Sequence, residues 1–427
     1  MSAQVSEYRL DGIYRQRQDG FFMQRVKLAA GVISSGQARA VAAAATCFGR
    51  GEIHLTTRGS MEIHWVKEAD LGDVKKALLA AGLTSRGACG GAVRGVTCAS
   101  QGAIGFPEVE TMARRIHRHF TANPRFERLP KKFKIGVEAE ASSRRHLIQD
   151  VGLVLVGSDD GFARYDLFVA GGLGREPQPG FLFETGVGEN RIIPLIEAIA
   201  RVYAAHTPAG KRLKHLIREI GEGEFRRLVA LEPSAAEELP AVTGLPENLA
   251  PPAGSRRIVA NSNTWGLTSA ELLVLADIAD QWAGGVLMAT ADQDIAFHVA
   301  ETHDPAEATI ALKRAGFDNG QVTFRVCPGN HQCLVGLSPT RDVARILIDS
   351  MGTNVKGLTW AISGCPNSCT QPQLADVGIV SASLIKAENG ERVPCFDLYR
   401  SGDAEFGSVV ARSLTLDELC ERVKEIG

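Results

Sequence analysis

The chain has 427 residues, which is too long for one ordinary hydrophobic core and long enough for two or three packed units. Its 47 lysines and arginines against 49 acidic residues give a net charge of −2, so the chain as a whole does not attract nucleic acid or an anionic membrane. No apolar run approaches the about 20 residues of a membrane helix, and the first residues lack the pattern of a secretory signal. We therefore expect a cytoplasmic protein of several lobes with no nucleic-acid or membrane partner.

An internal repeat organises the chain, because residues 25–83 match residues 259–317 in pattern without a gap. In each copy a strand-like turn leads into an Ala- and Leu-rich helix, predicted over 37–48 and 271–282. A second helix follows two strands, which we predict over 52–57 and 61–65 in one copy and 286–291 and 295–299 in the other. A single copy would leave one sheet edge and one helix face uncovered, so we predict that the copies pair across a pseudo-two-fold axis.

The two copies differ at one matched position, which is Arg58 in the first and Asp292 in the second. A chemical role for Arg58 would therefore belong to one half only. The alternative interpretation is a solvated arginine at a strand end.

Longer α/β stretches lie between and after the two copies, and a segment rich in Pro, Ala and Glu separates the first stretch from the second copy. The predicted domains are half-module 1 (1–89), α/β unit 1 (90–231), a linker (232–255), half-module 2 (256–319) and α/β unit 2 (320–427).

Four of the nine cysteines form the pairs Cys327-x5-Cys333 and Cys365-x3-Cys369. An odd number of cysteines in a long cytoplasmic chain argues against disulfides and favours metal or redox chemistry. Two short loops rich in Gly and Pro, each giving two sulfurs, let four thiolates converge on an iron–sulfur cube. Structural zinc is the main alternative, although its cysteines usually lie two to four residues apart. Four unrelated buried thiols are a further alternative.

This quartet, with its Cys-Pro-Asn-x-Cys second half, resembles the cluster motif of the sirohaem sulfite and nitrite reductases. The resemblance covers nearly the whole chain. It implies an α+β fold of two ferredoxin-like half-modules alternating with two α/β units that bind sirohaem and a [4Fe–4S] cluster, which agrees with the repeat. It also implies that Cys369 bridges to the sirohaem iron.

Three basic segments supply the fixed cations that holding a small oxyanion over a polyanionic macrocycle requires: 56–58, 92–96 and 129–134. By motif position, the resemblance places four side chains in the substrate pocket, namely Arg58, Arg94, Lys132 and Lys134. On a strand, the two lysines of this set point to one face. A solvated surface is the alternative for this lysine-rich segment.

The resemblance also implies contacts to the cofactors from Cys369, Lys131, Asn367, Arg212 and Lys214. The last two belong to a basic segment in which Pro208 and Gly210 replace basic residues of the family. The Arg94 loop departs from the family too, with Gly91 in place of Asp and Gly95 in place of Asn. These departures affect how Arg94 is oriented.

The remaining cysteines, Cys47, Cys89, Cys98, Cys395 and Cys420, are interpreted as packed thiols. The Gly-rich run 169–174 lacks full dinucleotide-loop spacing and is interpreted as a turn beside the cofactor.

The sequence and the resemblance together predict a reductase that converts sulfite to sulfide. Because no FAD or NAD fingerprint and no second ferredoxin-type cysteine cluster is present, the electrons must come from a ferredoxin or a flavoprotein. We predict sulfite as the first-choice substrate, because the resemblance implies Lys at the position of Lys134 in sulfite-reducing members and Asn in nitrite-reducing members. Nitrite reduction and the ring-contraction step of cobalamin synthesis (precorrin-3B synthase-like) are alternatives within the family, and a cluster or sirohaem electron-transfer protein without turnover is an alternative of another class.

Overall fold

The computed structural model describes residues 3–103, 105–159, 162–240, 254–261, 265–317, 322–351, 357–386, 390–402 and 406–426. Most of the predicted linker, residues 241–253, lies outside the described residues.

Two antiparallel sheets hold the repeated unit, and each takes one strand from the other copy. The first contains, in spatial order, β1 (Ile13–Arg15), β2 (Phe21–Val26), β5 (Met61–Lys67), β4 (Glu52–Leu55) and β11 (Gly266–Thr268). The second contains β10 (Arg256–Ala260), β13 (Ile295–Val299), β12 (Val286–Ala289) and β3 (Val32–Ser34). Because β11 pairs with β4 and β3 pairs with β12, each copy covers a sheet edge of the other.

The first helices of the two copies, α2 (Ser35–Phe48) and α7 (Ser269–Trp282), pack against each other. Each begins with a capping box, built on Ser34 in one copy and on Thr268 in the other. The outer helices of this layer are α3 (Leu71–Ala80), which follows η1 (Glu68–Asp70), and α8 (Pro305–Arg314). The predicted pairing of two ferredoxin-like half-modules is therefore confirmed, with the covered helix face lying between α2 and α7.

The first α/β unit contains a four-stranded sheet in which β6 runs parallel to β7 and the later strands are antiparallel. Its core includes the buried rings of Phe106, Phe133, Tyr165 and Tyr203. Its elements are α4 (Phe106–Phe120), η2 (Pro124–Phe126), β6 (Ile135–Glu138), η3 (Arg145–Ile148), β7 (Val151–Asp159), β8 (Phe162–Val169), β9 (Phe181–Gly188), α5 (Glu189–His206), α6 (Leu213–Leu231) and η4 (Pro233–Ala236).

The second α/β unit holds three parallel strands, β14, β15 and β16, and two antiparallel ones, β17 and β18. Trp360 is fully buried in its core. The elements are β14 (Thr323–Val326), η5 (Gly329–His331), α9 (Thr340–Ser350), β15 (Thr359–Ser363), η7 (Pro372–Leu374), β16 (Val377–Lys386), β17 (Arg392–Arg400), β18 (Ser408–Leu414) and α10 (Leu416–Ile426).

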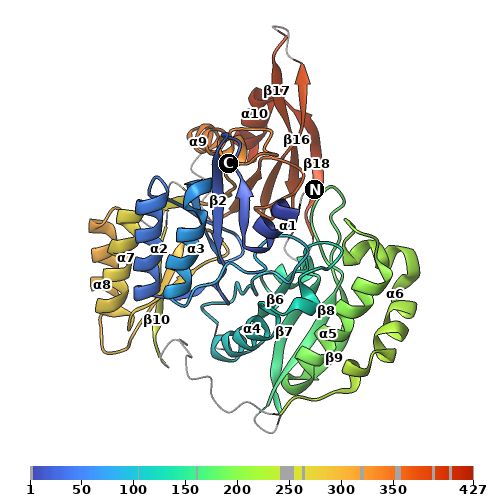
Figure 1. The fold of residues 1–427 in the computed structure, drawn as a ribbon. Coiled ribbons are helices and arrows are strands. Elements are labelled where there is room, and N and C mark those ends of the chain that lie inside the picture. Colours follow the sequence, from blue (N-terminus) through green and yellow to red (C-terminus); the bar gives the residue numbers. More distant parts are fainter. Residues whose placement is uncertain are drawn as a thin grey trace.

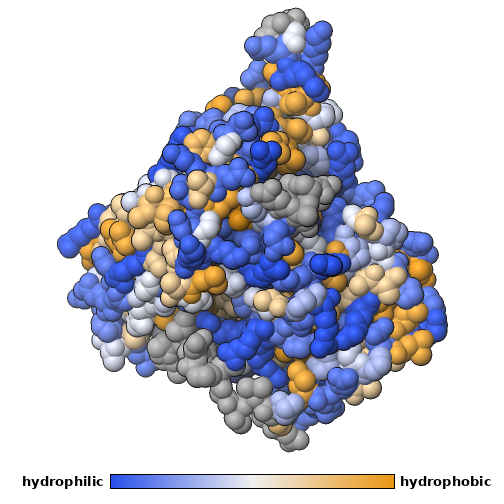
Figure 2. Space-filling model, in the orientation of Figure 1, coloured by the Kyte–Doolittle hydropathy of each residue, from blue (hydrophilic) through white to orange (hydrophobic). Residues whose placement is uncertain are grey.

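Figure 1 shows the helices α8, α7, α2 and α3 side by side on one side of the molecule and the β6–β9 sheet with α5 and α6 on the other. The strands β16, β17 and β18 extend away from both, and α1 (Ala3–Leu10) lies near the centre of the view. Figure 2 shows hydrophilic residues over most of the drawn face, with hydrophobic residues in separate patches. Among the described residues, no helix combines the length and the apolar character needed to cross a membrane.

Candidate active site

The two cysteine loops follow neighbouring parallel strands of the second α/β unit. Cys327 comes directly after β14, and Cys365 comes two residues after the end of β15. Because the carboxyl ends of parallel strands lie at the same edge of a sheet, the two loops meet there. The backbone N–H of Gly364 lies 3.1 Å from the Cys327 Sγ, which shows the contact directly.

Three glycines let these loops approach backbone to backbone. A Cβ at Gly336 would come within 2.4 Å of the Gly329 carbonyl carbon, and a Cβ at Gly364 would lie 3.0 Å from the Gly329 Cα. Gly329 itself has φ of +56°, which L residues rarely adopt. The Gly-rich composition of the two loops is therefore a packing requirement of the site.

The four thiols of the quartet are electrostatic neighbours. Burial and the nearby Cys369 raise the pKa of Cys327 to about 12 and that of Cys365 to about 11, and the same two causes raise the pKa of Cys333. Among the described residues, no three His, Cys, Asp or Glu side chains converge closely enough to hold a single ion. Four thiols that come from two loops suit a [4Fe–4S] cube, which takes four cysteine ligands.

The cluster loop is fastened to the first half-module through Thr57. The Thr57 Oγ1 donates to the Cys369 carbonyl at 2.7 Å, and the Gln371 Nε2 donates to the Thr57 carbonyl at 2.9 Å. The side chain of Cys369 is exposed, unlike that of Cys365. These contacts place the residue before Arg58 directly against the predicted bridging cysteine.

The two predicted pocket arginines are held by backbone carbonyls. Arg58 donates Nη1 to the Gln149 Oε1 at 2.9 Å and Nη2 to the Gly95 carbonyl at 2.8 Å. Arg94 lies beside Tyr14 and donates Nη2 to the Gly90 carbonyl at 2.9 Å. Its Nη1 is buried without a hydrogen-bond partner in the described part of the chain. Burial, followed by repulsion from Arg94, lowers the pKa of Arg58 to about 9, so Arg58 stays cationic at neutral pH.

Lys132 and Lys134 lie just before β6 and are both partly buried. Burial and repulsion from Arg212 lower the pKa of Lys132 to about 8. Burial, then repulsion from Arg58 and Lys132, lowers the pKa of Lys134 well below its ordinary value, while Cys369 acts in the opposite direction on both lysines. The side chains of Arg58, Arg94, Lys132 and Lys134 are therefore electrostatic neighbours, and the two lysines are also neighbours of Cys369.

Of the remaining predicted cofactor contacts, two side chains are buried against other parts of the protein and two are exposed. Arg212 forms a two-pronged buried ion pair with Asp150, at 3.1 and 2.7 Å. The Lys214 Nζ donates to the carbonyl of Leu173 at 3.2 Å and lies near two further carbonyls of the Gly-rich turn. Both side chains therefore brace the protein itself, whereas Lys131 and Asn367 are exposed.

The interpretation of the other cysteines needs one correction. Cys89, Cys98 and Cys395 are buried and Cys420 is partly buried, but Cys47 is exposed. The buried face of α2 is formed by residues such as Ala38, Ala42 and Ala45, and Cys47 lies off this face near the end of the helix.

Several residues that the sequence did not indicate lie among the predicted ones. Gln149 contacts Arg58, Asp150 contacts Arg212, and Gln371 contacts Thr57. These contacts join segments far apart in the sequence, so no local pattern could have found them. A fourth such residue, Lys27, is buried beneath the Arg94 loop.

The excess of positive charge fits an anionic cofactor and an anionic substrate. Burial, and then repulsion from neighbouring cations, lowers the pKa of Lys132 and of Lys134, so the site holds several basic groups close together. The buried Nη1 of Arg94 also lacks an acceptor among the described residues. The fold and the two cysteine loops therefore fit the class of redox proteins that hold an iron–sulfur cluster, here next to a group of basic side chains.

Comparisons with known proteins agree with this class. The profile of the nitrite and sulphite reductase 4Fe-4S domain matches residues 95–237, and that of the nitrite/sulfite reductase ferredoxin-like half domain matches residues 14–81. Sulfite reductase [ferredoxin] 2 of Mycolicibacterium paratuberculosis is 24% identical over 98% of this chain and 84% of its own length. Ferredoxin–nitrite reductase of Synechococcus elongatus is 25% identical over 95% of this chain and 85% of its own length.

The structure of Mycobacterium tuberculosis NirA protein has the same fold, with a TM-score of 0.83 at 22% identity over 99% of this chain and 86% of that one. The chain belongs to the sulfite and nitrite reductase family, whose members are oxidoreductases that carry sirohaem and a [4Fe–4S] cluster.

Proposed function

We propose that this chain reduces sulfite to sulfide with electrons from an external donor. The observation that carries the proposal is the gathering of Arg58, Arg94, Lys132 and Lys134 beside Cys369. Four convergent cations suit a dianion that must lie against a cofactor which is itself anionic.

In this proposal the chain's own residues bind and orient the oxyanion. Arg58 and Arg94 have fixed backbones and donate hydrogen bonds to its oxygens, and Lys132 and Lys134 add mobile ammonium groups that deliver protons as oxygen leaves. The quartet Cys327, Cys333, Cys365 and Cys369 would hold the [4Fe–4S] cluster. When bound, the cluster and the sirohaem supply electrons and an iron that takes the anion.

Nitrite is the second candidate substrate, because a relative named as a sulfite reductase and one named as a nitrite reductase are similar to this chain to the same degree. Nitrite is a smaller monoanion, so it would use fewer of the four cations. Ring contraction in cobalamin synthesis and electron transfer without turnover are the remaining outcomes that an assay must separate.

We propose a ferredoxin as the electron donor, as in the names of the two relatives. Leu334 and Val335, directly after Cys333, are 60% and 54% exposed, and Arg17 reaches over them to the Gly336 carbonyl at 2.6 Å. Two exposed apolar side chains with an arginine nearby, directly after a predicted cluster ligand, suit the docking of a small acidic electron-donor protein. A reducing, cytoplasmic setting belongs to the same proposal, since all nine cysteines are free.

The deciding experiment compares sulfite and nitrite with the purified protein carrying both cofactors, first with a reduced viologen dye and then with ferredoxin. We expect sulfide formation with a higher kcat/KM than ammonia formation. Metal analysis should find about four non-haem irons and one haem iron per chain. A protein with one zinc and no acid-labile sulfide, or with neither activity, would remove the proposal.

The donor contact is tested with L334E and V335E together. Ferredoxin-dependent turnover should fall several-fold while dye-dependent turnover is unchanged. L273E on α7, a leucine that is 41% exposed, is the matched control. Equal loss with both donors would show damage to the cluster rather than to docking.

A further inference from the structure

The repeat places opposite charges at equivalent turns. In the first copy the Thr56 Oγ1 accepts from the N–H groups of Arg58 at 3.3 Å and of Ser60 at 3.2 Å. In the second copy the Thr290 Oγ1 accepts from those of Asp292 at 3.2 Å and of Asp294 at 3.1 Å. The two turns therefore have the same hydrogen bonds, but one presents a guanidinium and the other a carboxylate.

Asp292 binds two arginines from different units. Its Oδ1 accepts from the Arg145 Nη2 at 2.7 Å and from the Arg325 Nη1 at 3.1 Å. Arg145 lies on η3 of the first α/β unit, and Arg325 lies on β14, two residues before Cys327. Both arginine side chains are buried, and Asp292 is the carboxylate that forms an ion pair with each of them.

One branch from Asp292 runs to the cluster loop. The Arg325 Nε donates to the Thr370 carbonyl at 3.0 Å, and its Nη2 donates to the Gln371 carbonyl at 3.2 Å. The Arg145 Nε donates to the Gln371 Oε1 at 2.9 Å. These bonds hold the two residues that follow Cys369.

A second branch runs to the substrate arginine. The Arg145 carbonyl accepts from the Gln149 Nε2 at 3.0 Å, and the Gln149 Oε1 accepts from the Arg58 Nη1 at 2.9 Å. A continuous set of charged and polar contacts therefore joins Asp292 to its counterpart Arg58 in the first copy. Networks of this kind are costly to leave partly satisfied.

We infer that Asp292 is a positioning residue that holds the Cys369 loop through Arg325 and Arg145 and holds Arg58 through Arg145 and Gln149. It acts through these partners and does not touch the substrate. Only one measurement, the sulfite KM, rests on the proposed function. The effect of Asp292 on the cluster loop is measured separately, through the reduction potential and the magnetic spectrum.

The test is Asp292→Asn in the protein loaded with both cofactors. Loss of the carboxylate removes the ion-pair partner that the two guanidiniums share and one negative charge, so the reduction potential of the cluster should become more positive. The reduced-state magnetic spectrum should change, and the sulfite KM should rise about tenfold while kcat falls less. Asp292→Glu should restore part of each effect.

The matched control is Asp277→Asn, because Asp277 also pairs with an arginine, Arg39, but is exposed. A D292N protein whose potential, spectrum and KM all match those of D277N would overturn the inference. If the wild type reduces neither sulfite nor nitrite, the proposed function fails, and the potential and the spectrum still decide the role of Asp292.

Gln149→Leu separates the two branches and serves if D292N does not fold. It removes the contacts of Gln149 to Arg58 and to the Arg145 carbonyl but keeps Asp292 and its two ion pairs, so the sulfite KM should rise while the cluster potential stays at the wild-type value. A shift of the cluster reduction potential without a change in the sulfite KM would contradict the proposal that Gln149 acts on Arg58.

Discussion

The ammonium group of Lys27 lies 3.4 Å from the carbonyl oxygen of Val93, the residue before Arg94. It also donates to the Arg86 carbonyl at 3.2 Å and to the Thr121 Oγ1 at 3.0 Å, so its three N–H bonds each have an acceptor. A Cβ at Gly95 would lie 3.3 Å from the Lys27 Cγ. A buried lysine stem therefore packs against Gly95, the residue after Arg94.

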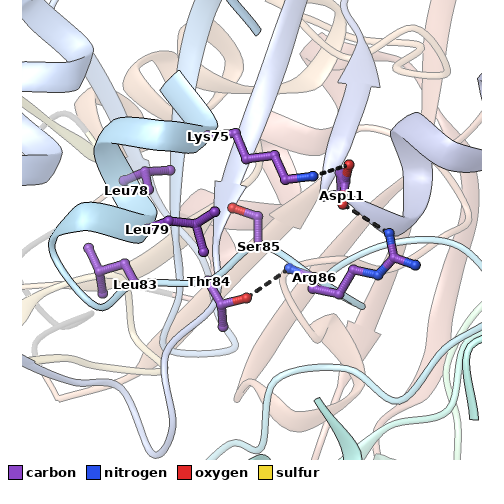
Figure 3. A pocket seen from close by; sticks show the side chains of 8 residues that line it. All are labelled: Asp11, Lys75, Leu78, Leu79, Leu83, Thr84, Ser85 and Arg86. Carbon is purple, nitrogen blue, oxygen red and sulfur yellow. Dashed lines mark hydrogen bonds and ion pairs between the residues drawn. The ribbon is translucent and has the colours of Figure 1, made fainter. Parts of the chain in front are cut away.

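The backbone of Arg86 is itself fixed. Figure 3 shows the Arg86 side chain reaching Asp11 beside Lys75 in a small pocket, and Arg86 also forms a two-pronged pair with Glu127. The Arg86 carbonyl is thus a firm acceptor for Lys27. Together these contacts fix the position of the Arg94 loop relative to Lys27.

Lys27→Met should loosen this loop. The methionine fills the space but leaves three buried acceptors without a donor, which should lower the free energy of unfolding by about 2 kcal/mol. The sulfite KM should rise several-fold, measured in the dye assay, with the cofactor spectrum unchanged. Lys75→Met, which removes a half-exposed lysine paired with Asp11 at 2.6 Å, should change either quantity little. Equal effects of the two substitutions would argue against a role for Lys27 in placing Arg94.

Cys369→Ser should uncouple the two cofactors, since a hydroxyl is a poor bridge between iron centres. The reduced-state magnetic spectrum should lose its coupling and sulfite turnover should fall by at least about a hundredfold. Cys420→Ser on α10, whose thiol is only partly buried, is the control and should behave as the wild type. Matching spectra for the two variants would show that Cys369 is not the bridge.

Glu138, the last residue of β6, should make stability depend on pH. Burial raises its pKa from 4.5 to about 7, although the Ala99 N–H and the Ser100 hydroxyl both donate to it. Between these two values the native state binds more protons than the unfolded chain. The stabilisation is therefore complete below pH 4.5 and is lost as the pH rises through about 7.

Glu138→Gln removes this titration, so the variant should lose less stability than the wild type between pH 5 and pH 8, by up to about 3 kcal/mol. Urea unfolding at the two pH values measures the difference. Glu140→Gln, at an exposed position two residues away, should keep the wild-type dependence. An identical pH slope in all three proteins would mean that Glu138 does not titrate in this range.

The repeat predicts the pairing of the two half-modules, whereas their alternation with two α/β units was expected from the family resemblance that the cysteine motif carries. The predicted helix over 37–48 corresponds to α2 (Ser35–Phe48), and the strand over 295–299 coincides with β13. The exchange of β3 and β11 between the sheets was not predicted, since short strands of three residues carry little periodic signal.

The supporting contacts of the site could not be predicted from the sequence. Asp292 was recognised as the counterpart of Arg58, but its pairing with Arg145 and Arg325 depends on how three units pack. Arg212 shows the same limit. Its motif position predicts a cofactor contact, but the sequence does not reveal that Arg212 also forms a buried ion pair with Asp150.

Substrate choice is expected to depend on Lys134. Its backbone is fixed by the Asp150 carboxylate, which accepts from the Lys134 N–H at 2.8 Å. Burial, and then repulsion from Arg58 and Lys132, lowers its pKa, and a bound anion would offset this repulsion and favour the charged form of Lys134. Near neutral pH part of the sulfite is present as the dianion, whereas nitrite is a monoanion, so a positive charge at this position favours sulfite.

Lys134→Asn should therefore weaken sulfite turnover much more than nitrite turnover. At an effective dielectric constant near 20, a unit charge about 4 Å away contributes on the order of 4 kcal/mol before desolvation is subtracted. Even a third of this energy changes relative affinity about tenfold. The measurement is the ratio of the two kcat/KM values with one electron donor, and Lys76→Asn, at an exposed lysine of α3, is the control. An unchanged ratio in K134N, or a wild type that already prefers nitrite, would count against sulfite as the substrate while leaving the family unaffected.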